Sequence, residues 1–265
     1  MFHQLKKIKG KFTSYQRQQQ RNKVNAFCEK YIQENNLQPL LDKVNAASNS
    51  TGAELYDYVT LHSYITTHKP QYILECGTGK STWILAHALQ QNHLRGGVKG
   101  IVISMESIEH WYNEAKNIFP EELKEYAEIH HSPATTYMYS FIKGTAFTQV
   151  PDYPYDFVFV DGPELTITEN GNSYETVNMD FIRFLLSSNK TATAIIDSRL
   201  RTSLAYGNIF GKDKVKFLKP WQVGIIQNVS KKDMLLHVDG VPLLQMLKQN
   251  TDFKYDNPEW LKNKL

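Results

Sequence analysis

The chain has 265 residues, of which 41% are hydrophobic, 22% charged and 12% aromatic, and its formal net charge is +3. This composition is typical of globular proteins and excludes a disordered or fibrous chain, and the length suffices for one sizeable α/β unit without a disulfide or metal staple. Two cysteines, Cys28 and Cys76, are too few for a disulfide framework, and no apolar run reaches the roughly 18 residues of a membrane span.

The first 23 residues are basic, because seven lysines and arginines precede the first acidic residue, Glu29. Apolar side chains recur among them at helical spacing, which predicts a short basic amphipathic helix. Three interpretations stay open: a solvated leader, docking on an anionic membrane surface or an acidic partner, and a cleaved organelle-targeting peptide.

The location and partners follow from the same charge pattern. We expect a cytoplasmic protein, with the inner face of a membrane as the place where residues 1–23 would bind peripherally. The rest of the chain is net acidic and lacks a basic face, so nucleic acid is not an expected partner. The oligomeric state that we expect is a homodimer.

The helical pattern continues over residues 24–46, and Ser48–Gly52 forms a break rich in small polar residues. Residues 1–50 are therefore expected to form a helical extension, and residues 51–265 the main domain. In that domain short apolar runs alternate with helix-length stretches. The predicted strands are 72–74, 101–105, 126–129, 157–160 and 192–196, and the predicted helices are 81–91, 109–118 and 174–186. This alternation predicts an α/β fold with a mostly parallel sheet covered on both faces.

The rhythm changes near the C-terminus. Residues 221–229 and 234–238 are apolar runs separated by Ser-Lys-Lys-Asp, which predicts an antiparallel hairpin at one edge of the sheet.

The most informative stretch is the run from Tyr72 to Thr82, in which an apolar strand leads into Gly77 and Gly79 and an apolar helix follows. Glycines at such a turn let a ligand approach the backbone at a helix N-terminus, although a tight turn without a ligand uses them too. The Gly79-Lys80-Ser81 string suggests a phosphate-binding loop, but such a loop needs an earlier glycine at the position that Leu74 occupies.

From Glu75, Gly77 and Gly79 onward, over roughly residues 53–240, the sequence resembles the class I S-adenosylmethionine-dependent methyltransferases. The resemblance implies a Rossmann-like sheet of seven strands and a cofactor held along successive strand ends. Glu106 matches the acidic residue that binds the ribose hydroxyls, with capping of the next helix as its alternative role. The cofactor-binding residues implied are Glu75, Gly77, Thr78, Gly79, Ser81, Glu106, Ser107, His131, Ser132, Asp161 and Gly162.

A narrower resemblance begins at Asp161-Gly162 and continues with Ser173-Tyr174-Glu175 ahead of a helix. It is to the subfamily that methylates hydroxyls of small molecules and sugars. Two departures are that the connection from Gly162 to Ser173 is longer than in the subfamily and that the fifth strand ends in Asp197-Ser198-Arg199.

The expected chemistry is alignment of a hydroxyl with the methyl group and removal of its proton. Asp161 and Asp197 are the candidate catalytic residues, either as general bases or as ligands of Mg²⁺, and both roles stay open. Alternative bases are His62, His68, His130 and His131, and alternative pocket walls are Tyr206, Phe210 and Trp221. Arg199 and Arg201 are expected either to bind an anionic acceptor or to be solvated.

The leading hypothesis is therefore an S-adenosylmethionine-dependent methyltransferase acting on a small-molecule or glycan hydroxyl. A nucleotide-hydrolysing P-loop protein and a non-catalytic Rossmann-like cofactor-binding module are the alternatives.

Overall fold

The computed structural model describes residues 18–19, 21–48, 54–140, 142–169, 171–211, 213–218 and 223–234. Several predicted features lie wholly or largely outside these residues. Of the predicted amphipathic helix 1–23, only residues 18–19 and 21–23 are described, and of the break at Ser48–Gly52 only Ser48 is described. Trp221 and residues 235–238 of the predicted hairpin also lie outside.

A sheet of seven strands forms the centre of the fold, in the order β10-β11-β9-β6-β1-β2-β3. Its strands are β1 (Tyr72–Cys76), β2 (Ile101–Glu106), β3 (Ala127–His131), β6 (Phe157–Val160), β9 (Ala192–Ile196), β10 (Val215–Leu218) and β11 (Val223–Val229). All neighbours pair in parallel except β11, which is antiparallel to both β9 and β10. The predicted Rossmann-like, mostly parallel sheet is confirmed.

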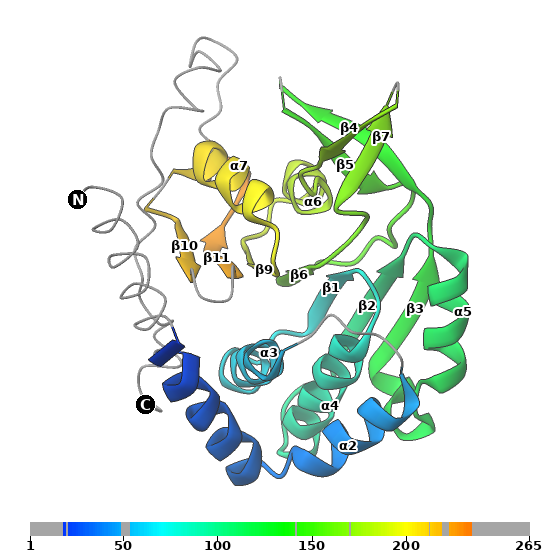
Figure 1. The fold of residues 1–265 in the computed structure, drawn as a ribbon, viewed down its shortest axis with the longest axis vertical. Helices are drawn as coiled ribbons and strands as arrows, with labels where there is room; N and C mark the ends of the chain where they lie inside the picture. The colour runs from blue at the N-terminus through cyan, green and yellow to red at the C-terminus, as the bar shows by residue number, and fades with distance from the viewer. Residues whose placement is uncertain are drawn as a thin grey trace, which may run out of the picture.

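Helices cover both faces of this sheet (Figure 1). They are α2 (Gln38–Ala47), α3 (Leu55–His68), α4 (Lys80–Leu94), α5 (Glu109–Ile118), α6 (Asp180–Ser187) and α7 (Leu200–Phe210), preceded by a helix of residues 21–34 that we call the N-terminal helix. Side chains of a strand alternate between the two faces. Ile73 accordingly packs with α3, α4 and the N-terminal helix, whereas Leu74 packs with α6 and α7.

Two hairpins extend the fold beyond α6, and the sequence did not predict them (Figure 1). The first pairs β4 (Ala134–Tyr139) with β5 (Ile142–Phe147), and the second pairs β7 (Thr166–Glu169) with β8 (Asn172–Glu175). The predicted helix 174–186 is therefore wrong in its first part. The Asn178 side-chain oxygen accepts hydrogen bonds from the backbone N–H groups of Asp180 and Phe181, so the helix begins only at Asp180.

The predicted C-terminal hairpin exists, and its strand β11 lies within the predicted run 221–229, but its other strand is β10. β11 lies between β9 and β10, so its antiparallel partner within the hairpin precedes it in the chain instead of following it. The Ser-Lys-Lys-Asp segment forms a short 3₁₀ turn at Lys231–Asp233, capped by Ser230. Within the described residues, no helix combines the length and the apolar character that crossing a membrane requires.

Candidate functional site

The strand order reverses at β1, because the chain first adds β2 and β3 on one side and later β6 and β9 on the other. In open α/β sheets, ligands bind beyond the carboxyl ends of the strands at such a point. The loop that leaves β1 there holds Gly77 at φ +99°, a backbone conformation that favours glycine. A Cβ on Gly77 would lie 2.9 Å from the backbone nitrogen of Gly162, so the loops after β1 and β6 pack backbone against backbone. Gly79 is extended at φ −177° and carries no such requirement.

Glu75 lies beneath this loop and has no exposed surface. Its carboxylate accepts hydrogen bonds of 2.6 Å each from the hydroxyls of Ser81, Thr82 and Ser104. Burial raises the pKa of Glu75 to about 7, although the three hydroxyls oppose the shift. The carboxylate therefore ties the start of α4 to β2 and faces protein on all sides.

Glu106 ends β2 in the next position along the sheet and is almost buried. One of its carboxylate oxygens accepts a hydrogen bond of 2.8 Å from the backbone nitrogen of Ile108, just before α5. Burial raises its pKa, and backbone N–H groups, including that of Thr78, lower it. The contact between Glu106 and the start of α5 is thus the helix-capping contact that the sequence offered as an alternative role. The second contact of Glu106, with the backbone of Thr78, connects it to the glycine loop.

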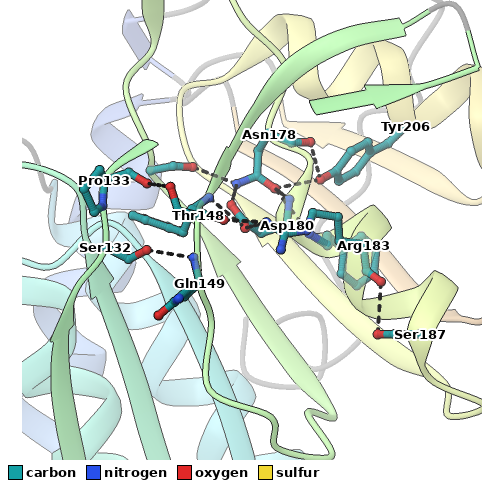
Figure 2. Close-up of polar contacts among 12 residues, drawn as sticks. Ser132, Pro133, Thr148, Gln149, Asn178, Asp180, Arg183, Ser187 and Tyr206 are labelled. Atoms are coloured by element: carbon teal, nitrogen blue, oxygen red, sulfur yellow. Dashed lines mark hydrogen bonds and ion pairs between the residues drawn. The ribbon is translucent and has the colours of Figure 1, made fainter. Parts of the chain in front are cut away.

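Ser107, His131 and Ser132 gather beside Glu106. The His131 ring nitrogen Nε2 lies 3.2 Å from the carbonyl oxygen of Ser107, and the backbone nitrogen of Ser132 donates to the carbonyl oxygen of Glu106. The Ser132 hydroxyl oxygen accepts a hydrogen bond of 2.9 Å from the backbone nitrogen of Gln149, as Figure 2 shows. The structure therefore brings the sequence-predicted residues of β2 and β3 together at one edge.

Asp161 follows β6, and its side chain is exposed to solvent. Its pKa is nevertheless raised to about 8, first because the surrounding protein desolvates the carboxylate and second because Asp197 is negatively charged. We use the name recess for the surroundings of this carboxylate at the ends of β6 and β9. Asp197 follows β9, is buried, and accepts a hydrogen bond from the Ser198 hydroxyl.

A third carboxylate at this edge, Asp57, was missed by the sequence analysis. It lies in the first turn of α3 and accepts a hydrogen bond of 2.8 Å from the backbone nitrogen of Glu54. Burial and the charge of Asp197 raise its pKa to about 8. The cap itself has a weak sequence signature, but only the tertiary packing of α3 brings Asp57 within electrostatic range of Asp161 and Asp197.

Arg199 is buried, which contradicts both expectations for it. Its guanidinium donates to the backbone carbonyl oxygens of Asp161, Pro163 and Glu164, so it holds the loop after β6 and does not face an acceptor. Arg201 donates to the backbone carbonyl oxygen of Glu175 and is exposed, which agrees with the solvated alternative. The structure therefore does not support a pair of arginines that binds an anionic acceptor.

Tyr206 and Phe210 belong to the core, so they do not wall a pocket as predicted. The Tyr206 hydroxyl donates to the backbone carbonyl oxygen of Asn178 at 3.0 Å, and Figure 2 shows both residues in the network that starts α6. The amphipathic pattern of α7 directs these aromatic rings inward, where they contact Phe181.

The candidate histidine bases have structural partners. His62 is fully buried and lies within hydrogen-bond distance of the Tyr31 hydroxyl and the Gln91 side-chain oxygen. His68 contacts the carbonyl oxygen of Tyr64, and His130 contacts the carboxylate of Glu128. None of these contacts joins a histidine to the recess of Asp161.

The lysine that suggested a phosphate-binding loop has a structural partner. The Lys80 ammonium donates to the side-chain oxygen of Asn45 at 3.0 Å and thus points toward α2. In the described part of the chain, no three or more histidine, cysteine, aspartate or glutamate side chains are grouped to hold a metal ion.

We expect Asp57→Asn to stabilise the protein at alkaline pH. The folded-state pKa of Asp57 is raised above its ordinary value of 3.8, so the folded state retains a proton that the unfolded chain releases as the pH rises toward about 8. The charged carboxylate therefore destabilises the fold most above that pH, and the variant removes this cost. The midpoint of thermal unfolding should rise by about 3 °C at pH 9 and change less at pH 5. Asp152→Asn, at an exposed position, is the control, and an equal shift at both pH values would contradict the interpretation.

Comparison with known proteins agrees with this geometry. Residues 74–199 match the family model described as a methyltransferase domain, and this segment includes the ends of β1, β2, β3, β6 and β9. A search of curated proteins found no match.

Three solved structures are similar to this chain. The SAH-bound Podospora anserina methyltransferase PaMTH1 is 12% identical, with a TM-score of 0.50 over 80% of this chain and 96% of that one. The O-methyltransferase TomG from Streptomyces achromogenes, in complex with SAM, is 15% identical, with a TM-score of 0.46 over 73% and 90%. The O-methyltransferase from Bacillus cereus, in complex with SAH, is 15% identical, with a TM-score of 0.44 over 77% and 91%. The matched segment includes the glycine loop after β1 and the ends of β6 and β9, so this part of the chain is similar to a methyltransferase domain.

Proposed function

We propose that the protein methylates a hydroxyl group of a small-molecule or glycan acceptor. S-adenosylmethionine supplies the methyl group as an activated electrophile when it is bound. The observation that carries the proposal is that Asp161 and Asp197 follow strands whose ends lie at the same edge as the glycine loop, with Asp57 of α3 within electrostatic range of both. A hydroxyl must lose its proton as it is methylated, and a carboxylate beside it accepts that proton.

The cofactor would lie across the ends of β1, β2 and β3. The backbone of residues 77–79 and Ser81 would contact its amino-acid end, Glu106 its ribose hydroxyls, and Ser107, His131 and Ser132 its adenine. The donor set fits this group, because Glu106 offers carboxylate oxygens to a vicinal diol. Glu75 would act by holding the loop, since its carboxylate faces only protein.

The acceptor hydroxyl would lie in the recess of Asp161, next to Gly162. Either Asp161 or Asp197 would accept its proton and become a neutral carboxyl group, and the negative charge of Asp57 would favour that uptake. Because their raised pKa values leave Asp57 and Asp161 partly protonated at neutral pH, the rate of methyl transfer should rise as the pH approaches about 8.

Binding of S-adenosylhomocysteine, measured by isothermal titration calorimetry, tests the cofactor site. Glu106→Gln retains an oxygen that can accept from Ile108 but weakens the contact with a diol, so we expect the dissociation constant to rise by about tenfold. Glu109→Gln, at an exposed position in the first turn of α5, is the control and should bind as the wild type does. A wild-type protein that fails to bind the compound would overturn the proposal.

Turnover separates an enzyme from a cofactor-binding module. Transfer of a labelled methyl group to a panel of hydroxylated compounds should be detectable with the wild type and should fall by about a hundredfold or more with Asp161→Asn, while S-adenosylhomocysteine still binds. Binding without any transfer would favour the module.

A further inference from the structure

A pocket of about 440 Å³ lies between the N-terminal helix, α2 and the start of α3. This volume is in the range of small-molecule sites. The polar and aromatic residues that line it are Gln18, Arg21, Asn25, Asn45, Glu54 and Tyr58. The lining thus combines carboxamide groups, a cation, an anion and an aromatic residue.

The charges of this lining cancel. The Arg21 guanidinium and the Glu54 carboxylate approach to 3.5 Å across the pocket wall, and both side chains remain substantially exposed. A lining with a balanced ion pair does not favour a strongly anionic or cationic ligand. Carboxamide groups both donate and accept hydrogen bonds, as sugar hydroxyls do, and Leu55, which is exposed, adds an apolar surface. The lining therefore matches a neutral ligand with several hydroxyl groups.

Two contacts connect the pocket to the candidate catalytic edge. The Asn45 side-chain oxygen accepts from Lys80, the first residue of α4 after the glycine loop. Glu54 caps α3 through Asp57, whose carboxylate is coupled electrostatically to Asp197 and Asp161. The first turn of α3 thus contributes residues to the pocket and also holds Asp57, which interacts electrostatically with Asp161 and Asp197.

We propose that this pocket binds a neutral, polyhydroxylated part of the acceptor, such as a sugar ring, and places the acceptor relative to the recess of Asp161. The inference rests on the proposed function, because it takes the pocket's ligand to be the methyl acceptor. It also specifies the acceptor class, since the lining selects against phosphorylated and acidic sugars.

Saturation-transfer NMR on the full chain tests the proposal with methyl α-glucopyranoside, methyl β-galactopyranoside and N-acetylglucosamine as probes. We expect at least one probe to bind the wild type, and glucose 6-phosphate to bind more weakly. Asn25→Trp, which fills the pocket from the exposed N-terminal helix, should weaken that binding by about tenfold or more, and so should Asn45→Leu. Ala26→Trp places the same bulk at an exposed position of that helix outside the lining and should bind as the wild type does.

Binding of S-adenosylhomocysteine, measured on the same samples, separates the two proposals. Both tryptophan variants should retain it, which also shows that they are folded. If the wild type binds S-adenosylhomocysteine but no probe, or if Asn25→Trp leaves probe binding unchanged, the pocket proposal is overturned and the proposed function stands. If the probes bind in the pocket but S-adenosylhomocysteine does not bind, the proposed function fails instead.

Discussion

Glu75→Ala should lower the midpoint of thermal unfolding by about 10 °C and abolish detectable binding of S-adenosylhomocysteine. The substitution removes a fully buried carboxylate that accepts hydrogen bonds from Ser81, Thr82 and Ser104. Each buried hydroxyl that loses its partner costs about 1 kcal/mol or more, and a change of about 3 kcal/mol corresponds to about 10 °C in a domain of this size. The start of α4 also loses its attachment to β2, so the glycine loop is no longer held.

Glu75→Gln provides the matched comparison. It keeps the size of the side chain, and its amide offers one acceptor and a donor group, so the hydroxyls can partly reorient and the loss should be clearly smaller than with alanine. Glu122→Ala, at an exposed glutamate paired with Lys43, should change the midpoint by no more than about 2 °C. Differential scanning calorimetry measures all three variants. Equal midpoints for Glu75→Ala and Glu122→Ala would show that the buried network does not stabilise the fold.

Gly77→Ala should weaken the binding of S-adenosylhomocysteine by about a hundredfold. Alanine at φ +99° costs about 1 kcal/mol by itself. In addition, its Cβ would lie 2.9 Å from the nitrogen of Gly162 and 3.0 Å from the carbonyl carbon of Asp161, and both are backbone atoms that cannot rotate away. The loops after β1 and β6 must therefore separate, which moves Asp161 away from the cofactor loop.

Gly171→Ala is the control for the backbone strain. Gly171 has a similarly positive φ of +79°, but a Cβ there would meet nothing within 4 Å. The control should lose a small amount of stability and no affinity. Isothermal titration calorimetry of the two variants separates strain from the close approach of the loops, and equal affinities for both would argue against a cradle made by the two loops.

Much of the candidate site could be predicted because parallel strands bring their carboxyl ends to one edge. β6 and β9 have the predicted bounds, and Glu106, Asp161 and Asp197 end or follow three strands of the same sheet. Once the apolar runs are recognised as parallel strands, the residues after them share an edge whatever the intervening loops do. Gly77 was also recognisable, since a glycine directly after a strand is typical of a tight turn.

The sequence by itself therefore determined the α/β fold, the open edge of the sheet and the residues at its strand ends, because these depend on local patterns of apolar residues and turns. Only the tertiary structure decided which polar side chains face that edge. Arg199 turns back beneath the loop after β6, Tyr206 enters the core, and Asp57 reaches the recess from α3. These outcomes depend on contacts between segments far apart in the chain, and a side chain's own neighbours in sequence do not specify such contacts.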